Sequence, residues 1–302
     1  MSVSGVLILD KPKGLTSHDV VARVRRVLGT RRVGHAGTLD PDATGVLVVC
    51  VGDATRLAEY VAADEKSYDG TVVFGISTDT DDAAGRVLAQ ASAAQLTEEQ
   101  VAAAAERLTG VQSQTAPRVS AVHVQGKRAH ELVRAGQAFE APVRTVVIRS
   151  LLVHSFQPGE LATAAFSVTC SKGTYVRALC RDWGAALGLP AHMGALRRTR
   201  SGVFSIDDAT PLEVWEASER PAKALLPPVA ALQEMPKVVI DHDTCMKLAR
   251  GQSVRHSAAR DVPDGTLCAA VTSDGQLAAI AEVSGAGASG YLAPKKVFWK
   301  KD

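Results

Sequence analysis

The sequence predicts an α+β fold with a mixed, largely antiparallel central sheet flanked by helices, followed by a small C-terminal β-rich module. Strand-like and helix-like segments alternate along the 302 residues without a regular βαβ period. The chain is long enough for one large domain and one small one. Four prolines between residues 221 and 236 mark a linker. We therefore expect domains at 1–235 and 236–302, with few contacts across the boundary.

The first elements follow from apolar patterning. Residues 5–9 form a short apolar strand, and Ser17 is expected to cap the N-terminus of a helix that ends at Gly29. Residues 30–45 have no periodicity and predict a loop. Residues 46–51 are continuously apolar and β-branched, which is typical of a buried strand.

The later elements alternate in type. Thr97 and Gln100 form a capping box for an Ala-rich helix that ends near Leu108. Residues 127–135 are typical of a short basic helix. The other expected elements are, in order, a helix at 54–63, strands at 67–75, 119–125, 143–156 and 161–170, a helix at 174–187, strands near 195–199 and at 238–240, a helix at 244–250, and strands near 266–272 and 276–283.

The composition indicates an ordinary soluble globular protein. Hydrophobic residues make up 46% of the chain and charged residues 22%. No apolar run approaches the ~18 residues of a membrane span, and the first residues lack the features of a signal peptide. Five widely spaced cysteines favour a reducing cytoplasm over a disulfide framework. No zinc-ligand spacing occurs, so we expect a cytoplasmic protein with no metal and no membrane partner.

The net charge of +2 hides a segregated distribution. Basic residues gather in 1–35, which includes Lys11, and in 172–200, which includes Arg197 and Arg198. Acidic residues dominate 53–106. This segregation indicates a polyanion-binding face opposed by an acidic back, although clusters of solvated surface charge would give the same pattern.

Residues 34–45 carry the strongest chemical signal. Three glycines in this segment permit unusual backbone angles, and they frame His35 and Asp40 just before the buried strand. A carboxylate held by a rigid strand can act as a nucleophile or a base. Residues 40–44 also match the DxDxT pattern of magnesium-dependent phosphotransferases, in which the apolar strand instead precedes the first Asp. A surface turn is the third interpretation.

The whole segment resembles the catalytic motif of the TruB family, the tRNA pseudouridine-55 synthases, whose pattern is G-H-x-G-x-L-D-P-x-A-x-G. Every fixed position of that motif is met. Further family motifs occur in the family's order, namely K-P-x-G-x-[ST]-S at 11–17, K-x-Y at 66–68, C-S-K-G-T-Y-[IV]-R at 170–177 and L-R-R at 196–198. Together these motifs make the resemblance specific, although any one of them alone would be weak.

The resemblance implies the pseudouridine-synthase fold and an enzyme that isomerises the uridine at position 55 in the T loop of tRNA. It implies no cofactor, and we expect a monomer whose partner is the T-stem loop. The implied site residues are Asp40 as nucleophile, Tyr68 stacked on the flipped uracil, Arg177 paired with Asp40, Tyr175 and Leu196 lining the base pocket, His35 filling the space vacated in the RNA, and Lys11 binding substrate.

Elementary physics supports these roles. A uridine inside a folded loop presents neither its glycosidic bond nor C6, so it must leave its stack at a cost of roughly a few kcal/mol. Stacking on His35 and Tyr68 offsets that cost, since each base–aromatic contact is worth about 1–3 kcal/mol. A guanidinium at Arg177 keeps the carboxylate of Asp40 ionised in a closed pocket.

Two regions leave alternatives open. Residues 118–142 resemble a thumb-like insertion that grips the RNA, but His123 and His130 stand where the family commonly has lysine and tyrosine. The tail from residue 236 resembles a PUA-type RNA-binding module, chiefly through residues 248–254, and could instead be a purely stabilising domain. The rival function from another class is a non-catalytic RNA-binding protein that folds tRNA through the same basic face.

Overall fold

The computed structural model describes residues 3–62, 65–120, 122–124, 126–128, 131–132, 135, 137–285 and 290–300. A mixed sheet of ten strands runs through the first two thirds of the described chain in the order β14-β1-β3-β12-β4-β11-β10-β7, with β2 paired to β3 and β13 to β12. Two pairings, β1 with β14 and β3 with β12, are parallel, and the others in this sheet are antiparallel. The strands are β1 (Gly5–Lys11), β2 (Val33–Ala36), β3 (Thr44–Val51), β4 (Lys66–Phe74), β7 (Gly110–Thr115), β10 (Val143–Gln157), β11 (Thr163–Cys170), β12 (Ala191–Ser201), β13 (Phe204–Ser205) and β14 (Thr210–Pro211).

Four helices cover one face of this sheet. They are α1 (Ser17–Leu28), α3 (Glu98–Arg107), α5 (Val176–Ala186) and α6 (Leu212–Glu216), and their buried side chains share one apolar core with the strands. Trp183 of α5 sits at its centre, edge-on to Phe74 and Phe166 with ring centroids 5.9 and 5.7 Å away. Its indole nitrogen donates to the backbone of Val101 in α3, which satisfies the polar atom that burial would otherwise leave unpaired.

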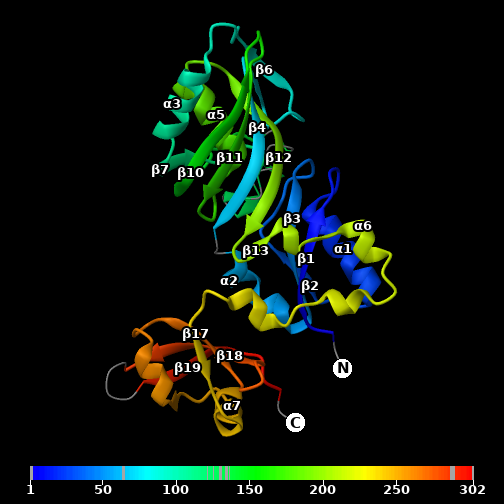
Figure 1. The fold of residues 1–302 in the computed structure, drawn as a ribbon, viewed down its shortest axis with the longest axis vertical. Helices are drawn as coiled ribbons and strands as arrows, with labels where there is room; N and C mark the ends of the chain where they lie inside the picture. The colour runs from blue at the N-terminus through cyan, green and yellow to red at the C-terminus, as the bar shows by residue number, and fades with distance from the viewer. Residues whose placement is uncertain are drawn as a thin grey trace.

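A second sheet of five strands forms the C-terminal module, in the order β15-β17-β18-β19-β16. Figure 1 shows this module, coloured orange to red, at one end of the long axis of the molecule beside β1–β3. Its elements are β15 (Lys237–Val239), α7 (His242–Ala249), β16 (Val254–Arg255), β17 (Leu267–Val271), β18 (Leu277–Ser284) and β19 (Tyr291–Val297).

The two sheets are joined by a continuous apolar cluster, so the expectation of few contacts across residue 236 is wrong. Ile8 and Val48, on the face of β1 and β3 opposite α1, pack in one cluster with Val271 and Ile280 of the C-terminal module. The proline-rich stretch itself packs on the sheet, since Leu226 exchanges two backbone hydrogen bonds with β1. Polar contacts add to this interface: Lys300 lies 3.4 Å from Asp53, Lys296 pairs with Glu59, and the Arg56 guanidinium lies over the Phe298 ring.

Several expected elements differ in detail. The N-cap of α1 is Thr16 rather than Ser17, because Thr16 and Asp19 complete a capping box that leaves Ser17 buried inside the first turn. The loop expected at 30–45 contains β2, whose four residues are too few for a periodicity to emerge. The helix expected at 54–63 begins as the 3-10 helix η1 (Gly52–Leu57) and continues as α2 (Ala58–Ala62).

The thumb-like region also differs. Lys127–Arg128 forms strand β9, paired with β8 (His123–Val124), at the start of the expected basic helix 127–135, whereas Glu131 and Leu132 are helical as expected. Gly126 has a φ of +81° and lies in the tight turn between these two strands. Residues of a right-handed helix have negative φ, so the chain at Gly126 turns into a hairpin rather than into a helix. His130 lies outside the described residues. No helix among the described residues is long and apolar enough to cross a membrane.

Candidate active site

Asp40 lies in the loop between β2 and β3, and three side chains from distant elements hold this loop. Ser17, in the first turn of α1, accepts a hydrogen bond from the backbone nitrogen of Leu39 at 2.8 Å and donates one to its carbonyl at 3.1 Å. Both bonds are buried, so the residue before Asp40 is fixed to the start of a helix. Ser17 was expected to cap the helix, but its hydroxyl instead forms hydrogen bonds with the backbone of the Asp40 loop.

Lys11 is the second anchor. Its side chain is fully buried, and Nζ donates to the carbonyls of Pro12, Leu15 and Pro41 at 2.9, 2.6 and 3.0 Å. Burial lowers the pKa of Lys11 from 10.5 to about 8, partly opposed by the charges of Asp40 and Asp42. All three ammonium hydrogens are used by these carbonyls, two in the connection between β1 and α1 and one in the Asp40 loop, so Lys11 ties the two segments together. No donor of Lys11 is left for the expected contact with substrate.

Arg198 is the third anchor. Its place in a basic segment predicted an exposed position on a polyanion-binding face, and the structure buries it. Its side chain is only 1% exposed and donates to the carbonyls of Val46, Thr38 and Gly37 at 2.7, 3.4 and 3.1 Å. A planar guanidinium with five donors can bind several carbonyls of one loop at once. Arg198 is thus unavailable to a polyanion. The L-R-R motif at residues 196–198 was the signal in the sequence that could have revealed this structural role.

Arg177, the second residue of α5, lies directly behind Asp40. Its Nη2 donates to Oδ1 of Asp40 at 3.2 Å, and its Nε lies 2.9 Å from Oδ2. The Nε–Oδ2 approach is an ionic contact without hydrogen-bond geometry. The side chain of Arg177 is 6% exposed and that of Asp40 is 37% exposed. The carboxylate therefore faces solvent while its counter-charge is enclosed by protein.

The remaining atoms of the Arg177 guanidinium are also occupied. Nη1 donates to the carbonyl of Thr80 at 2.8 Å, and Nη2 donates to that of Val119 at 3.1 Å. Oδ2 of Asp82 lies 3.7 Å from Nη1. The acidic residues of 53–106 were expected on the back of the molecule, but Asp82 lies at the site, in contact with Arg177.

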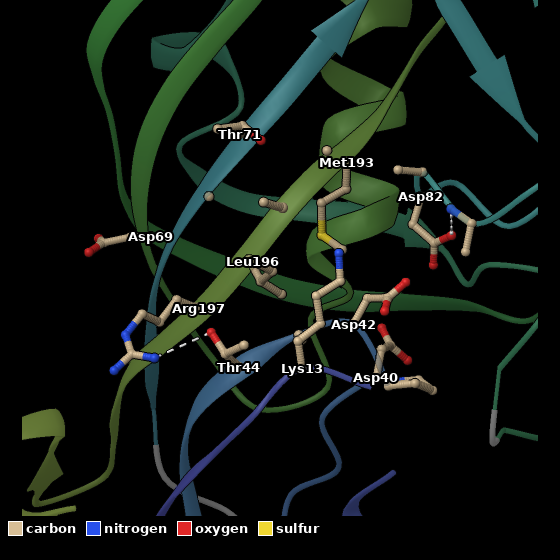
Figure 2. Close-up of a pocket in the computed structure, with 17 residues that line it drawn as sticks. Lys13, Asp40, Asp42, Thr44, Asp69, Thr71, Asp82, Met193, Leu196 and Arg197 are labelled. Atoms are coloured by element: carbon tan, nitrogen blue, oxygen red, sulfur yellow. Dashed lines mark hydrogen bonds between the residues drawn. The ribbon is translucent and has the colours of Figure 1, made fainter. Parts of the chain in front are cut away.

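A cleft of about 500 Å³ opens beside Asp40 (Figure 2). Asp40 and Leu196 are the predicted site residues among those that line it. The other lining residues are Lys13 from the connection between β1 and α1, Pro41, Asp42 and Ala43 from the Asp40 loop, Thr44 from β3, Asp69, Gly70 and Thr71 from β4, Asp82, Ala83 and Ala84, and Met193, Gly194, Ala195 and Arg197 from β12. Arg197 forms a bidentate pair with Asp10 at 3.1 and 2.7 Å, so its charge is already largely matched.

Tyr68 and Tyr175 were expected at the base pocket, but neither is among the residues that line the cleft. Tyr68, on β4, is 9% exposed, and burial raises the pKa of its hydroxyl, while the neighbouring Arg198 guanidinium opposes that shift. Tyr175 is the N-cap residue of α5. The side-chain amide of Gln114 accepts a hydrogen bond from the backbone nitrogen of Tyr175 at 2.8 Å and donates one to the Tyr175 carbonyl at 3.1 Å. The Arg144 guanidinium lies 5.5 Å from the centroid of the Tyr175 ring. Neither Gln114 nor Arg144 was anticipated from the sequence.

His35 lies on β2, is half-buried and does not line the cleft. Burial lowers the pKa of His35, and the positive charge of Arg198 lowers it further, so the ring is neutral at pH 7. A neutral ring suits stacking on a base. Among the described residues there is no cluster of three or more His, Cys, Asp or Glu that could hold a metal ion.

Comparison with known proteins identifies the family. The description "TruB family pseudouridylate synthase (N terminal domain)" matches residues 25–176, and "tRNA pseudouridylate synthase B C-terminal domain" matches residues 177–232. The chain belongs to the TruB family. The resemblance inferred from the motifs is therefore confirmed, and so is the enzyme class, a pseudouridine synthase.

Relatives cover most of this TruB-family chain. A tRNA pseudouridine synthase B of Symbiobacterium thermophilum is 49% identical over 249 residues, which is 82% of each chain. One from an Arthrobacter species is 42% identical over 303 residues, covering 98% of this chain and 97% of its own. The solved structure of an H/ACA RNP bound to a substrate RNA containing 2'-deoxyuridine is 25% identical with a TM-score of 0.76, over 99% of this chain and 86% of that one. The pseudouridine-synthase fold is thereby confirmed.

Proposed function

We propose that this TruB-family enzyme isomerises the uridine at position 55 in the T loop of tRNA to pseudouridine, with Asp40 as its catalytic residue. The names of its relatives, tRNA pseudouridine synthase B, support tRNA as the substrate. The TruB catalytic motif at residues 34–45 supports the T-loop position, because the family that carries it acts there.

One observation carries the proposal: the carboxylate of Asp40 faces a cleft of about 500 Å³ while Arg177 holds it from behind. This volume lies within the usual range for small-molecule sites, so it can accept a flipped nucleoside rather than a duplex. Leu196 and Met193 supply apolar walls for the base. Arg177 places a positive charge and a hydrogen-bond donor against the carboxylate that either nucleophilic attack or proton removal requires.

The reaction is balanced without any co-reactant. The N1–C1′ bond breaks, the uracil turns within the cleft, and C5 forms the new bond to C1′. The proton displaced from C5 is lost and N1 gains one, so the product is an isomer of the substrate. In this reaction Asp40 attacks C1′ or C6, or it removes a proton. None of these steps needs a metal.

The test uses an unmodified tRNA transcript in excess EDTA, with chemical mapping of pseudouridine at every uridine. We expect product at position 55 and none with Asp40→Asn, whose affinity for tRNA should stay within about tenfold of wild type, or ~1.4 kcal/mol. Turnover by Asp40→Asn would refute the catalytic assignment. Product at another uridine would refute the position, and tRNA folding without product would favour the non-catalytic rival.

We also propose that the enzyme acts as a monomer and that residues 236–302 form a PUA-like RNA-binding module. The five-stranded sheet of this module supports the second part. Cross-linking to tRNA, followed by mapping of the linked peptides, should recover this module together with the thumb-like segment 118–142. Sedimentation at concentrations above the tRNA Kd should give the mass of one chain.

A further inference from the structure

Helix α5 carries two arginines, Arg177 and Arg181, spaced four residues apart and therefore on one face. Each donates to the same two segments of the chain. Arg177 donates to the carbonyls of Thr80 and Val119. Arg181 lies one turn further along, pairs with the Asp81 carboxylate at 2.8 Å and donates to the carbonyl of Thr115 at 2.9 Å. Arg181 was counted only as surface charge in the sequence.

Asp81 has an unusual backbone. It is the one non-glycine residue with a positive φ, 61°, among the described residues. This left-handed conformation costs free energy for a residue with a Cβ, so surrounding contacts must impose it. Two contacts do so: the ion pair with Arg181, and a hydrogen bond from the backbone nitrogen of Met193 to the Asp81 carbonyl at 3.0 Å.

The neighbours of Asp81 on both sides contact Arg177. The carbonyl of Thr80 accepts from Nη1, and the carboxylate of Asp82 lies 3.7 Å from the same atom. The left-handed turn at Asp81 lets the residues on either side of it, Thr80 and Asp82, present a backbone carbonyl and a side chain to one guanidinium. Met193, which also holds this turn, lines the cleft.

We propose that the Arg181–Asp81 ion pair is a positioning device that holds the turn at residues 80–82 and thereby sets Arg177 against Asp40. This inference rests on the proposed roles of Asp40 and Arg177. Neither Arg181 nor Asp81 lines the cleft, so both act through Arg177 rather than on the substrate. Because small misplacements at a reacting centre have large effects on rate, losing the pair should lower kcat and leave tRNA binding intact.

The test measures single-turnover pseudouridine formation and tRNA Kd for five single variants. Asp81→Asn keeps the shape and tolerates a positive φ but loses the charge, and Asp81→Gly adopts a positive φ freely but loses the anchor. Arg181→Met removes the pair, and Arg181→Lys restores the charge without the second donor. The matched control is Asp182→Asn, because Asp182 also pairs with Arg181, at 2.9 Å, but does not belong to the turn.

We expect Asp81→Asn, Asp81→Gly and Arg181→Met each to lower the rate at least about tenfold, with Kd unchanged within about twofold and Arg181→Lys intermediate. The control should stay within about twofold of the wild-type rate. Should Arg181→Met fail to fold, the two Asp81 variants decide. Wild-type rates in both Asp81 variants would overturn the proposal. A wild-type rate in Asp81→Gly alone would overturn it too, because that variant lacks the ion pair. An active Asp40→Asn would instead show that the proposed function itself has failed.

Discussion

At the scale of single residues, the pairing of Asp40 with Arg177 combines an exposed carboxylate with an enclosed cation. The guanidinium is shared among Asp40, Asp82 and the carbonyls of Thr80 and Val119, so its position does not depend on Asp40 alone. The carboxylate has its counter-charge on the protein side, so its other side stays open to the cleft. This separation is what makes it available for chemistry.

Arg177→Met tests that separation. The variant leaves two carboxylates, Asp40 and Asp82, without their shared cation and removes the guanidinium donor to Asp40. Pseudouridine formation should fall by about 10²–10³-fold, because the carboxylate loses both its counter-charge and its fixed position. Arg177→Lys should lie between, since an ammonium supplies charge but not the planar fork. A wild-type single-turnover rate in Arg177→Met would contradict the role of the pair.

Lys11 gives a second prediction, in which activity and stability move in opposite directions. Its pKa is about 8 in the folded protein and 10.5 in the unfolded chain. Between these values the unfolded chain binds more protons, so the contribution of Lys11 to the free energy of unfolding increases with pH, and its burial cost is fully present below pH 8. Activity should decrease over the same range, because a neutral amine has two hydrogens for the three carbonyls it now binds.

The measurement compares wild type with Lys11→Met by urea unfolding and by single-turnover rate from about pH 7 to about pH 10. The difference between their free energies of unfolding should shift in favour of wild type as the pH rises. The wild-type rate should decline while the variant, already impaired, shows no such decline. Parallel pH profiles for both proteins would rule out a titrating Lys11 in this range.

At the scale of elements, the site depends on the close parallel contact between β3 and β12. Gly45 pairs with Arg198 in this contact and has a φ of +99°. A Cβ placed there would lie 2.2 Å from the Arg198 carbonyl oxygen. Only glycine at position 45 therefore lets the two strands approach this closely. Their contact places Arg198, which anchors the Asp40 loop, and Leu196, which forms a wall of the cleft, beside the start of β3.

Gly45→Ala should therefore lower the free energy of unfolding by more than about 1 kcal/mol and reduce activity, because both the angle and the clash oppose it. Gly34→Ala is the matched control, since no atom lies within 4 Å of a Cβ at that position. We expect the control to stay within about 0.5 kcal/mol of wild type. Thermal and urea unfolding of the two variants side by side provide the measurement, and equal effects would contradict the close-approach argument.

At the scale of the whole molecule, the C-terminal module forms part of the core. The outer face of β1 and β3 is covered by β17, β18 and the proline-rich segment, whereas the inner face is covered by α1 and α6. The central strands are therefore apolar on both sides, which explains the unbroken apolar run of β3. The cleft lies farther along the sheet, beyond this double layer.

Deletion of residues 236–302 should expose Ile8, Val48 and their neighbours to water. We expect the shortened chain to be insoluble or to lose its cooperative thermal transition, and the full chain to unfold in one transition. Differential scanning calorimetry of both chains is the measurement. A soluble deletion variant that unfolds cooperatively and makes pseudouridine would show that the shared cluster is dispensable.

The sequence by itself predicted the α+β class, the mixed sheet, most element positions, the family, and the loop that carries Asp40. These depend on local patterns and on motif order, which a linear chain displays directly. The tertiary structure alone decided which charges are buried. Lys11, Arg177 and Arg198 belong to basic segments whose charge counts predict an exposed face. Each is instead buried against carbonyls or carboxylates from segments far away in the chain. Burial of a charge depends on partners that meet only when the sheet closes, and so does the core shared between the two sheets.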